Sequence, residues 1–166
     1  MDIFEQLRGN AVVEANNLTG LRNGHMVAQA AYGGGVGNGK LENGVILQLD
    51  AKNELVLADG HANAFLHYSE EHMKFLDSAS LDMFYLPLVE GEKVYPRAIA
   101  LYEGDTFTTD KYTGTFPADA DYYDVTVANG ILTVAETKGG AGPIAKASTL
   151  PSGKKAIEVV WRGGNA

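Results

Sequence analysis

The chain has 166 residues, of which 45% are hydrophobic and 20% are charged, and its formal net charge is -8. Such a chain folds as one domain, or as two small subdomains that share a core, and it is not intrinsically disordered. The negative charge repels phosphate backbones, so we expect no nucleic-acid partner. Cysteine is absent, which excludes disulfides, thiolate catalysis and cysteine-ligated metals.

We expect no targeting signal at the beginning of the chain. Met1 to Asn10 contains Asp2 and Glu5 and lacks a long apolar core, so we expect no signal peptide. No segment approaches the roughly 18 apolar residues that a membrane-spanning helix needs, so we expect no membrane partner. The sequence therefore favours synthesis and folding in a cytoplasm.

Residues 1–20 are predicted to form an N-terminal arm or a short helix. Asp2 and Glu5 have the spacing of a helix capping box, and two apolar residues would share one helix face. A terminus without fixed contacts and an arm that docks onto a neighbouring chain are equally open interpretations. In the docking interpretation the contact residues are Ile3, Phe4 and Leu7.

Asn-Gly pairs indicate where the chain turns, because both residues tolerate the positive φ of a type I′ hairpin. Asn43-Gly44 precedes a strand predicted over residues 45–49, and Asn129-Gly130 lies between strands predicted over 125–127 and 131–134. The polar residues 50–53 then turn the first of these strands into residues 55–57. We therefore predict two hairpins, at 45–57 and at 125–134.

The stretch from Gly33 to Lys40 is so rich in glycine that ordering it is costly. We predict a flexible surface loop, which a partner could order on contact. The stretch matches a phosphate-binding loop up to Lys40, but Leu41 replaces the required Ser or Thr, and a strand follows where a helix is needed. No nucleotide cofactor is therefore expected. The residues proposed for a partner contact are Gly33, Gly34, Gly35, Val36 and Gly37.

Residues 61–83 form the one region with helical character, and Ser69 is placed to cap a short helix there. This region also contains three residues that could ligate a metal ion: His61, His67 and His72. On a helix, however, His67 and His72 would point about 140° apart. We interpret the histidines as exposed polar residues around the helix. The apolar run from Leu81 to Val89 that follows is predicted to be buried, as a strand that ends at Pro87.

Asp119, Asp121 and Asp124 alternate with other residues, as calcium ligands can. The glycine and the closing Glu of the common calcium loop are missing, so we favour a solvated acidic loop. No combination of Ser, His and an acidic residue has a recognisable catalytic context. We therefore expect no catalytic residue, no metal and no cofactor.

The last third of the chain alternates short β-type runs with turn signals. Residues 97–101 form a strand candidate, and Ile157, Val159 and Trp161 would point to one face of a half-buried final strand. The predicted fold class is all-β, a small β-barrel or β-sandwich with one short helix and an N-terminal arm. Residues 21–166 form a single β domain, which could divide into subdomains 21–94 and 95–166.

Four motifs follow one another in this last third. They are Gly104-Asp105-Thr106-Phe107, the run Val125 to Thr133 around Asn129-Gly130, Gly142-Pro143-Ile144-Ala145-Lys146-Ala147, and Leu150-Pro151-Ser152-Gly153-Lys154-Lys155-Ala156-Ile157-Glu158-Val159. In this order they resemble the head decoration (cement) proteins of tailed bacteriophages. Residues 1–89 show no such match.

The resemblance implies a non-enzymatic, all-β protein that binds the outer surface of a phage head and stabilises the shell. Its partner would be the major capsid protein, and it would self-associate as a trimer or another small oligomer. Its place would be the virion, after synthesis in the host cytoplasm. Two alternatives stay open: another virion β module of a tail, baseplate or head fibre, and a small-ligand-binding or hydrolytic β domain that uses the three histidines.

Overall fold

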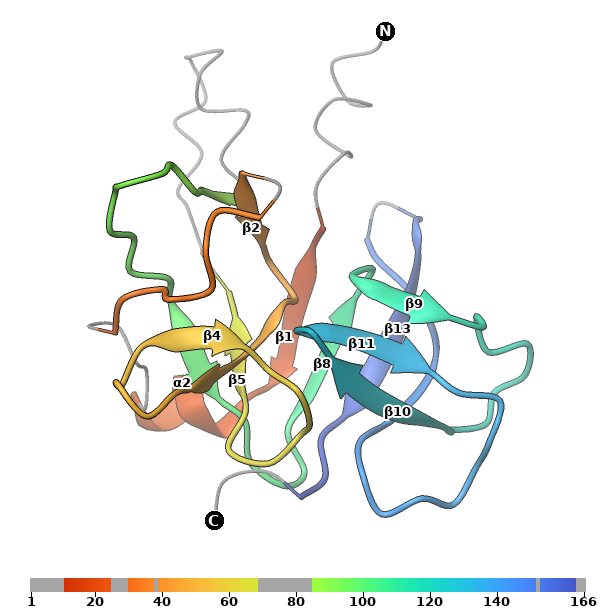
Figure 1. Cartoon of the computed structure of the whole chain (residues 1–166). Coiled ribbons are helices and arrows are strands. Elements are labelled where there is room, and N and C mark those ends of the chain that lie inside the picture. Colours follow the sequence, from red (N-terminus) through yellow and green to blue (C-terminus); the bar gives the residue numbers. More distant parts are fainter. Residues whose placement is uncertain (1–10, 25–29, 38, 69–84, 152, 164–166) are drawn as a thin grey trace, which may run out of the picture.

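The computed structural model describes residues 11–24, 30–37, 39–68, 85–151 and 153–163. They form an all-β structure with one short helix, which confirms the predicted fold class (Figure 1). The described strands make three sheets and no closed barrel. In chain order the elements are β1 (Val13–Asn17), α2 (Thr19–Asn23), β2 (Lys40–Glu42), β3 (Ile46–Leu49), β4 (Leu55–Leu57), β5 (Phe65–His67), β6 (Tyr85–Pro87), β7 (Ala98–Ala100), β8 (Thr106–Thr109), β9 (Tyr112–Gly114), β10 (Tyr123–Ala128), β11 (Ile131–Val134), β12 (Ile144–Thr149) and β13 (Lys155–Val160).

The larger sheet has seven strands in the order β1-β8-β13-β12-β10-β11-β9. Its neighbours are antiparallel except β11 and β9, which run parallel. Strand β10 pairs with β12 through Tyr123 and Asp124, and with β11 from Val125 onward. The final strand alternates as predicted, since Ile157, Val159 and Trp161 are fully buried.

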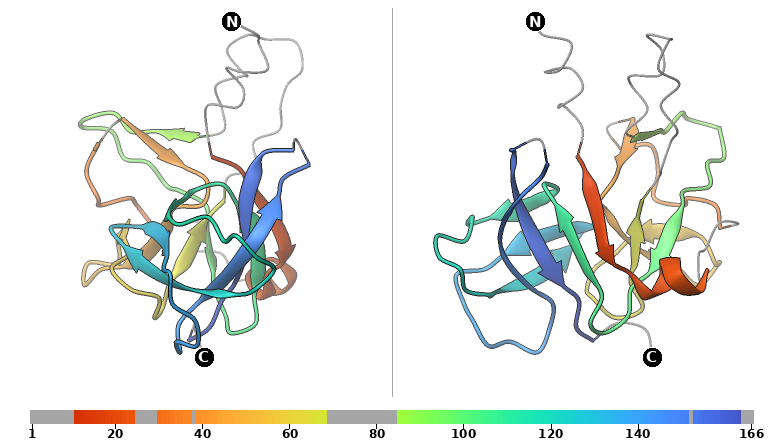
Figure 2. Two further views of the ribbon diagram at one scale, coloured as in Figure 1. Left: turned by 90° about the vertical axis from the view of Figure 1, so that its right-hand side faces the viewer. Right: turned by 180° about the vertical axis from the view of Figure 1, so that it is seen from behind.

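The second sheet has four antiparallel strands in the order β4-β3-β5-β7, and β2 pairs with β6 in a separate two-stranded sheet. The predicted hairpin of β3 and β4 is confirmed. Its turn is held by Asp50, whose Oδ1 accepts hydrogen bonds from the N–H groups of Lys52 and Glu54 at 2.8 and 2.9 Å. Seen from behind, the four-stranded sheet and the C-terminal strands lie on opposite sides of the molecule (Figure 2, right).

One hydrophobic core joins the two larger sheets. Ile46, Leu66 and Ile99 from the four-stranded sheet pack in the same buried cluster as Phe107 and Trp161 from the other side. The rings of Phe107 and Trp161 lie 6.4 Å apart in a tilted arrangement. Burying apolar side chains from both halves in a single cluster couples the folding of one half to the other.

The Asn129-Gly130 hairpin is the main polar joint between the two sheets. Asn129 and Gly130 have φ values of 50° and 73°, and Ala128 pairs with Ile131, as predicted for a two-residue turn. The Gly130 N–H donates to the Ala58 carbonyl at 2.8 Å, and the Ile46 N–H donates to the Gly130 carbonyl at 2.8 Å. The tip of one sheet is thus bonded to the backbone of the other.

A buried carboxylate forms a second joint. Asp105 is 1% exposed, and its Oδ1 accepts hydrogen bonds from the N–H and the hydroxyl of Thr19, at 2.9 and 2.7 Å. Its Oδ2 accepts from the Tyr102 N–H at 2.9 Å. Since Leu18 offers no capping side chain, Asp105 satisfies the first N–H of α2 from a distant part of the chain. It thereby attaches α2 to the turn before β8.

The structure places several segments differently from the prediction. Residues 11–20, assigned to an arm, form β1, which pairs with β8, and the beginning of α2. The proposed division at 94/95 does not follow the sheets, because β7 belongs with β3, β4 and β5. The helix expected after Ser69 lies outside the described residues, and the described helix is α2.

The joint at Gly130 leads to a prediction with an internal control. A Cβ at Gly130 would stand 2.8 Å from Leu57 Cδ2 and 2.9 Å from the Ile46 carbonyl oxygen, whereas one at Gly153 would meet nothing within 4 Å. Both glycines have positive φ, so alanine at either position strains the backbone. We expect Gly153→Ala to lower the free energy of unfolding by about 1 kcal/mol through this strain alone. Gly130→Ala adds a steric clash and should lower it by about 3 kcal/mol in total.

Chemical denaturation of both variants measures the difference. An equal loss in the free energy of unfolding for Gly130→Ala and Gly153→Ala would contradict the close docking of the hairpin onto the four-stranded sheet.

Candidate partner-binding cleft

The outer face of the four-stranded sheet carries a second hydrophobic cluster. Leu47, Leu55 and Phe65 point to this side, opposite to the shared core. Leu41 of β2 and Leu88, which follows β6, belong to the same cluster. Tyr32 and Val94, from the neighbouring loops, pack against it. In Figure 1 the covering segments, residues 30–37 and 85–94, lie together beside β2. The surface made by these two segments is the candidate site.

The glycine-rich segment is attached at both of its ends. The Tyr32 N–H donates to the Val94 carbonyl at 2.9 Å, and the Gly33 N–H donates to the Leu55 carbonyl at 2.8 Å. The Gly39 N–H closes a turn onto the Val36 carbonyl at 2.7 Å. Gly35 and Gly37 take positive φ, so the sequence supplies glycine where the turn needs it. These bonds leave Val36 at the exposed tip of the loop.

The opposite wall is the turn that follows β6. The Leu88 N–H donates to the Gly39 carbonyl at 2.9 Å, the Glu92 N–H donates to the Val89 carbonyl at 3.1 Å, and Gly91 has a φ of 82°. Strand β6 ends at Pro87 as predicted. The expected burial through Val89 is wrong, because Val89 is 49% exposed. Val89 lies beyond the end of β6, in the turn that projects from the two-stranded sheet.

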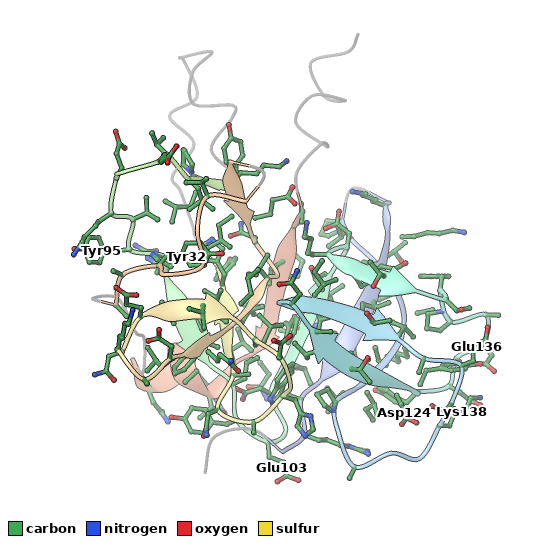
Figure 3. All side chains as sticks on the ribbon, viewed as in Figure 1. Tyr32, Tyr95, Glu103, Asp124, Glu136 and Lys138 are labelled. Atoms are coloured by element: carbon green, nitrogen blue, oxygen red, sulfur yellow. The ribbon has the colours of Figure 1, made fainter. Side chains whose placement is uncertain are left out.

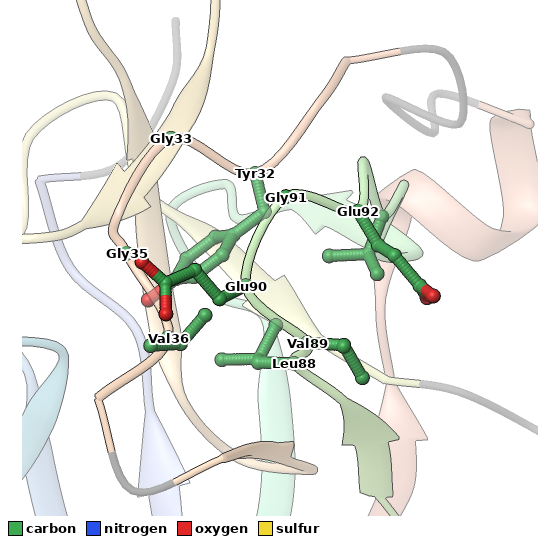
Figure 4. Close-up of a pocket in the computed structure, with 10 residues that line it drawn as sticks. Tyr32, Gly33, Gly35, Val36, Leu88, Val89, Glu90, Gly91 and Glu92 are labelled. Atoms are coloured by element: carbon green, nitrogen blue, oxygen red, sulfur yellow. The ribbon is translucent and has the colours of Figure 1, made fainter.

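A cleft runs between the two loops (Figure 4). Of the six large hydrophobic side chains that the described residues expose most, three belong to these loops or their continuation: Val36, Val89 and Tyr95. Tyr95, at 54%, is the most exposed of them, and Figure 3 places it on the same side of the molecule as Tyr32. The residues that line the cleft are Tyr32, Gly33, Gly35, Val36, Leu88, Val89, Glu90, Gly91, Glu92 and Val94.

The charge of this cleft is negative. Glu90 and Glu92 line it, and none of the described residues that line it is a Lys or Arg. Within the described part of the chain neither Glu forms a salt bridge. A third carboxylate is near, because the Glu54 side chain lies against Gly33 of the glycine-rich loop. Burial raises the pKa of Tyr32, so its phenol stays neutral and adds no charge. The cleft therefore combines aliphatic walls with unpaired carboxylates.

A buried ion network lies behind the glycine-rich loop and connects it to the larger sheet. Glu42, 9% exposed, pairs with Lys40 at 3.1 Å and with Lys111, which belongs to the turn between β8 and β9. Burial alone would raise the Glu42 pKa, but the hydrogen bonds and charges of Lys111 and Lys40 outweigh it and hold the pKa below its usual value. Lys40 thus has a structural partner and opens no helix, as expected from the failed phosphate-loop motif.

The predicted contact residues divide into two groups. Ile3, Phe4 and Leu7 lie outside the described residues. Gly33, Gly34, Gly35, Val36 and Gly37 are all exposed, and three of them, Gly33, Gly35 and Val36, line the cleft. Their role in binding stays a prediction. The opposite wall, from Val89 to Glu92, was not anticipated, although Pro87 and Glu90-Gly91-Glu92 mark a turn in the sequence.

The interpretation of the histidines as exposed residues around a helix is wrong for His67. His67 ends strand β5, is fully buried, and has its Nδ1 2.9 Å from the Arg97 carbonyl oxygen. Because this nitrogen can donate to the carbonyl, the neutral ring fits a core position. His61 lies instead against Gly142 and Gly163. The two described histidines therefore do not form one site, and His72 lies outside the described residues.

The acidic loop agrees with the solvated interpretation. Asp119 and Asp121 are exposed, and Lys138 Nζ bridges their carboxylates at 3.3 and 2.6 Å. Asp124 is bonded separately, accepting from the Gly140 N–H at 2.7 Å. Among the described residues no group of three or more His, Asp or Glu is placed to hold a metal ion. None of the helices in that part of the chain has the length and apolar character needed to cross a bilayer.

Comparison with known proteins gave no relative. No family model, no curated protein and no solved structure matches the chain.

The buried His67 predicts a pH dependence of stability. Burial lowers its pKa from 6.5 to about 4, so between these values the unfolded chain binds a proton that the folded chain does not. Stability therefore falls as the pH falls, by about 2 kcal/mol from pH 7 to pH 5. The lowered pKa of Glu42 also stabilises the fold, but this contribution is lost only as the pH falls below about 4.5, the pKa of Glu42 in the unfolded chain. The change in stability between pH 7 and pH 5 therefore reports mainly on His67.

Denaturation at a series of pH values measures the free energy of unfolding as a function of pH. Between pH 7 and pH 5 this free energy should change little in His67→Gln, whereas in His61→Gln it should fall as in the unmodified protein. A slope that survives in His67→Gln would contradict this assignment.

Proposed function

We propose that the protein is a non-enzymatic decoration protein that binds the outer surface of a phage head and stabilises the shell. The observation that carries the proposal is the C-terminal series of motifs, because three of the four fall on turns or joints of the fold. Asp105 anchors α2, Asn129-Gly130 docks on the four-stranded sheet, and Gly153 turns β12 into β13. A related protein that kept this fold would keep these motifs.

The physical mechanism is bridging between capsid subunits. A protein that contacts two major capsid subunits makes their separation depend on breaking two interfaces at once. The second contact forms at high effective concentration, so modest interfaces add up to a strong one. Self-association into a trimer or another small oligomer would multiply the number of bridges in the same way.

The exposed loops support a binding role better than a catalytic one. Val36 and Val89 present apolar surface in the cleft that Glu90 and Glu92 also line, and these carboxylates form no salt bridge among the described residues, which is suited to recognition. The alternative of chemistry at His61, His67 and His72 is less well supported, since His61 and His67 have different surroundings and His72 lies outside the described residues. No particular observation favours a tail, baseplate or fibre module over a head protein.

The proposal predicts that the purified protein binds expanded heads of the matching phage and raises their resistance to heat and to chelators. Co-sedimentation measures binding, and release of packaged DNA on heating measures shell stability. Unexpanded proheads serve as the control and should bind less. Failure to bind the expanded heads would refute the proposal.

A further inference from the structure

We propose that the cleft between residues 33–36 and 88–94 binds an extended segment of the major capsid protein, in which an aliphatic or aromatic side chain stands next to Lys or Arg. This inference rests on the proposed function and adds the chemistry of the contact. It also assigns the docking face, which the resemblance leaves undetermined.

The apolar half of this preference follows from the walls of the cleft. Val36 and Val89, from opposite loops, are 38% and 49% exposed, and Leu88 lies buried beneath them. A side chain inserted between these loops would remove all of this apolar surface from water, at about 25 cal/mol for each Å². An aliphatic or aromatic anchor gains most from such a position.

The basic half follows from the unpaired charges. Glu90 and Glu92 stand on the cleft, and among the described residues that line it there is no Lys or Arg. A Lys or Arg beside the anchor could pair with these two carboxylates, for which the described residues offer no salt bridge, and would steer the encounter. The same charges disfavour nucleic acid and anionic lipid surfaces. A second copy of this chain is a poor occupant, because each copy carries a net charge of -8.

The extended form of the segment follows from the glycines. Gly35 and Gly91 both line the cleft, one on each loop, and neither has an atom within 4 Å of the place where a Cβ would stand. A partner backbone can therefore approach the loop backbones without meeting side chains. The hydrogen bonds from Tyr32, Gly33 and Leu88 hold both walls in place before contact, which lowers the entropy that binding must offset.

Two variants test the inference on the full chain, with expanded heads of the matching phage as the probe. Glu90→Gln with Glu92→Gln removes the charge, and Val89→Ser removes the apolar wall. Matched controls are Glu103→Gln, an exposed Glu that Figure 3 shows well away from Tyr32, and Leu21→Ser, an exposed apolar residue on α2.

We expect each cleft variant to weaken binding about tenfold at low salt, and the controls to bind like the unmodified protein. The charge variant should also lose most of the salt dependence of binding, a change that a structural role would not cause. Melting curves verify that each variant is folded. We expect all of them to fold, because the substituted side chains are exposed.

The outcomes separate the two claims. If the unmodified protein binds and both cleft variants bind equally well, the cleft inference is wrong and the decoration function stands. If only the charge variant or only Val89→Ser binds normally, the stated chemistry of the segment is wrong. If the unmodified protein does not bind expanded heads, both claims fall.

Discussion

The docking of the Asn129-Gly130 tip onto the four-stranded sheet is the constraint on which the rest of the structure depends. Two backbone hydrogen bonds at 2.8 Å join Gly130 to Ala58 and Ile46, and the Asn129 N–H donates to Asp59 Oδ1 at 2.7 Å. Backbone groups of two sheets can bond so closely only where no side chain intervenes. The shared core then closes over this joint, so the two halves form one cooperative unit rather than separable domains.

This arrangement frees the outer face of the small sheet for loops. The inner face is committed to the shared core, and β3 and β5 alternate so that Leu47 and Phe65 must be covered from outside. The chain covers them with glycine-rich and turn segments, which present backbone and short side chains to solvent. A surface of this kind is pre-formed for binding, because the Gly33 N–H donates to Leu55 of the sheet and the Leu88 N–H donates to Gly39 of the facing loop.

Local signals in the sequence predicted the local structure. Both hairpins, the end of β6 at Pro87 and the alternation that buries Trp161 follow from residues adjacent in the chain. Distant contacts could not be predicted. Nothing near Val13 shows that it pairs with Thr109, so residues 11–20 read as an arm. His67 appears polar in sequence, and its burial depends on distant partners such as the Arg97 carbonyl, 30 residues away. The glycine-rich wall of the cleft was predicted from its glycine content. The acidic wall was not, because its position depends on the pairing of β6 with β2.

The central claim is that this face of the protein meets the shell of a phage head. Electron cryomicroscopy of expanded heads with the protein bound tests it most directly. The account predicts repeated density over the outer surface, with the loops at residues 33–36 and 88–94 against a capsid segment. Density that turns these loops toward solvent, or that appears only on the tail, would contradict it.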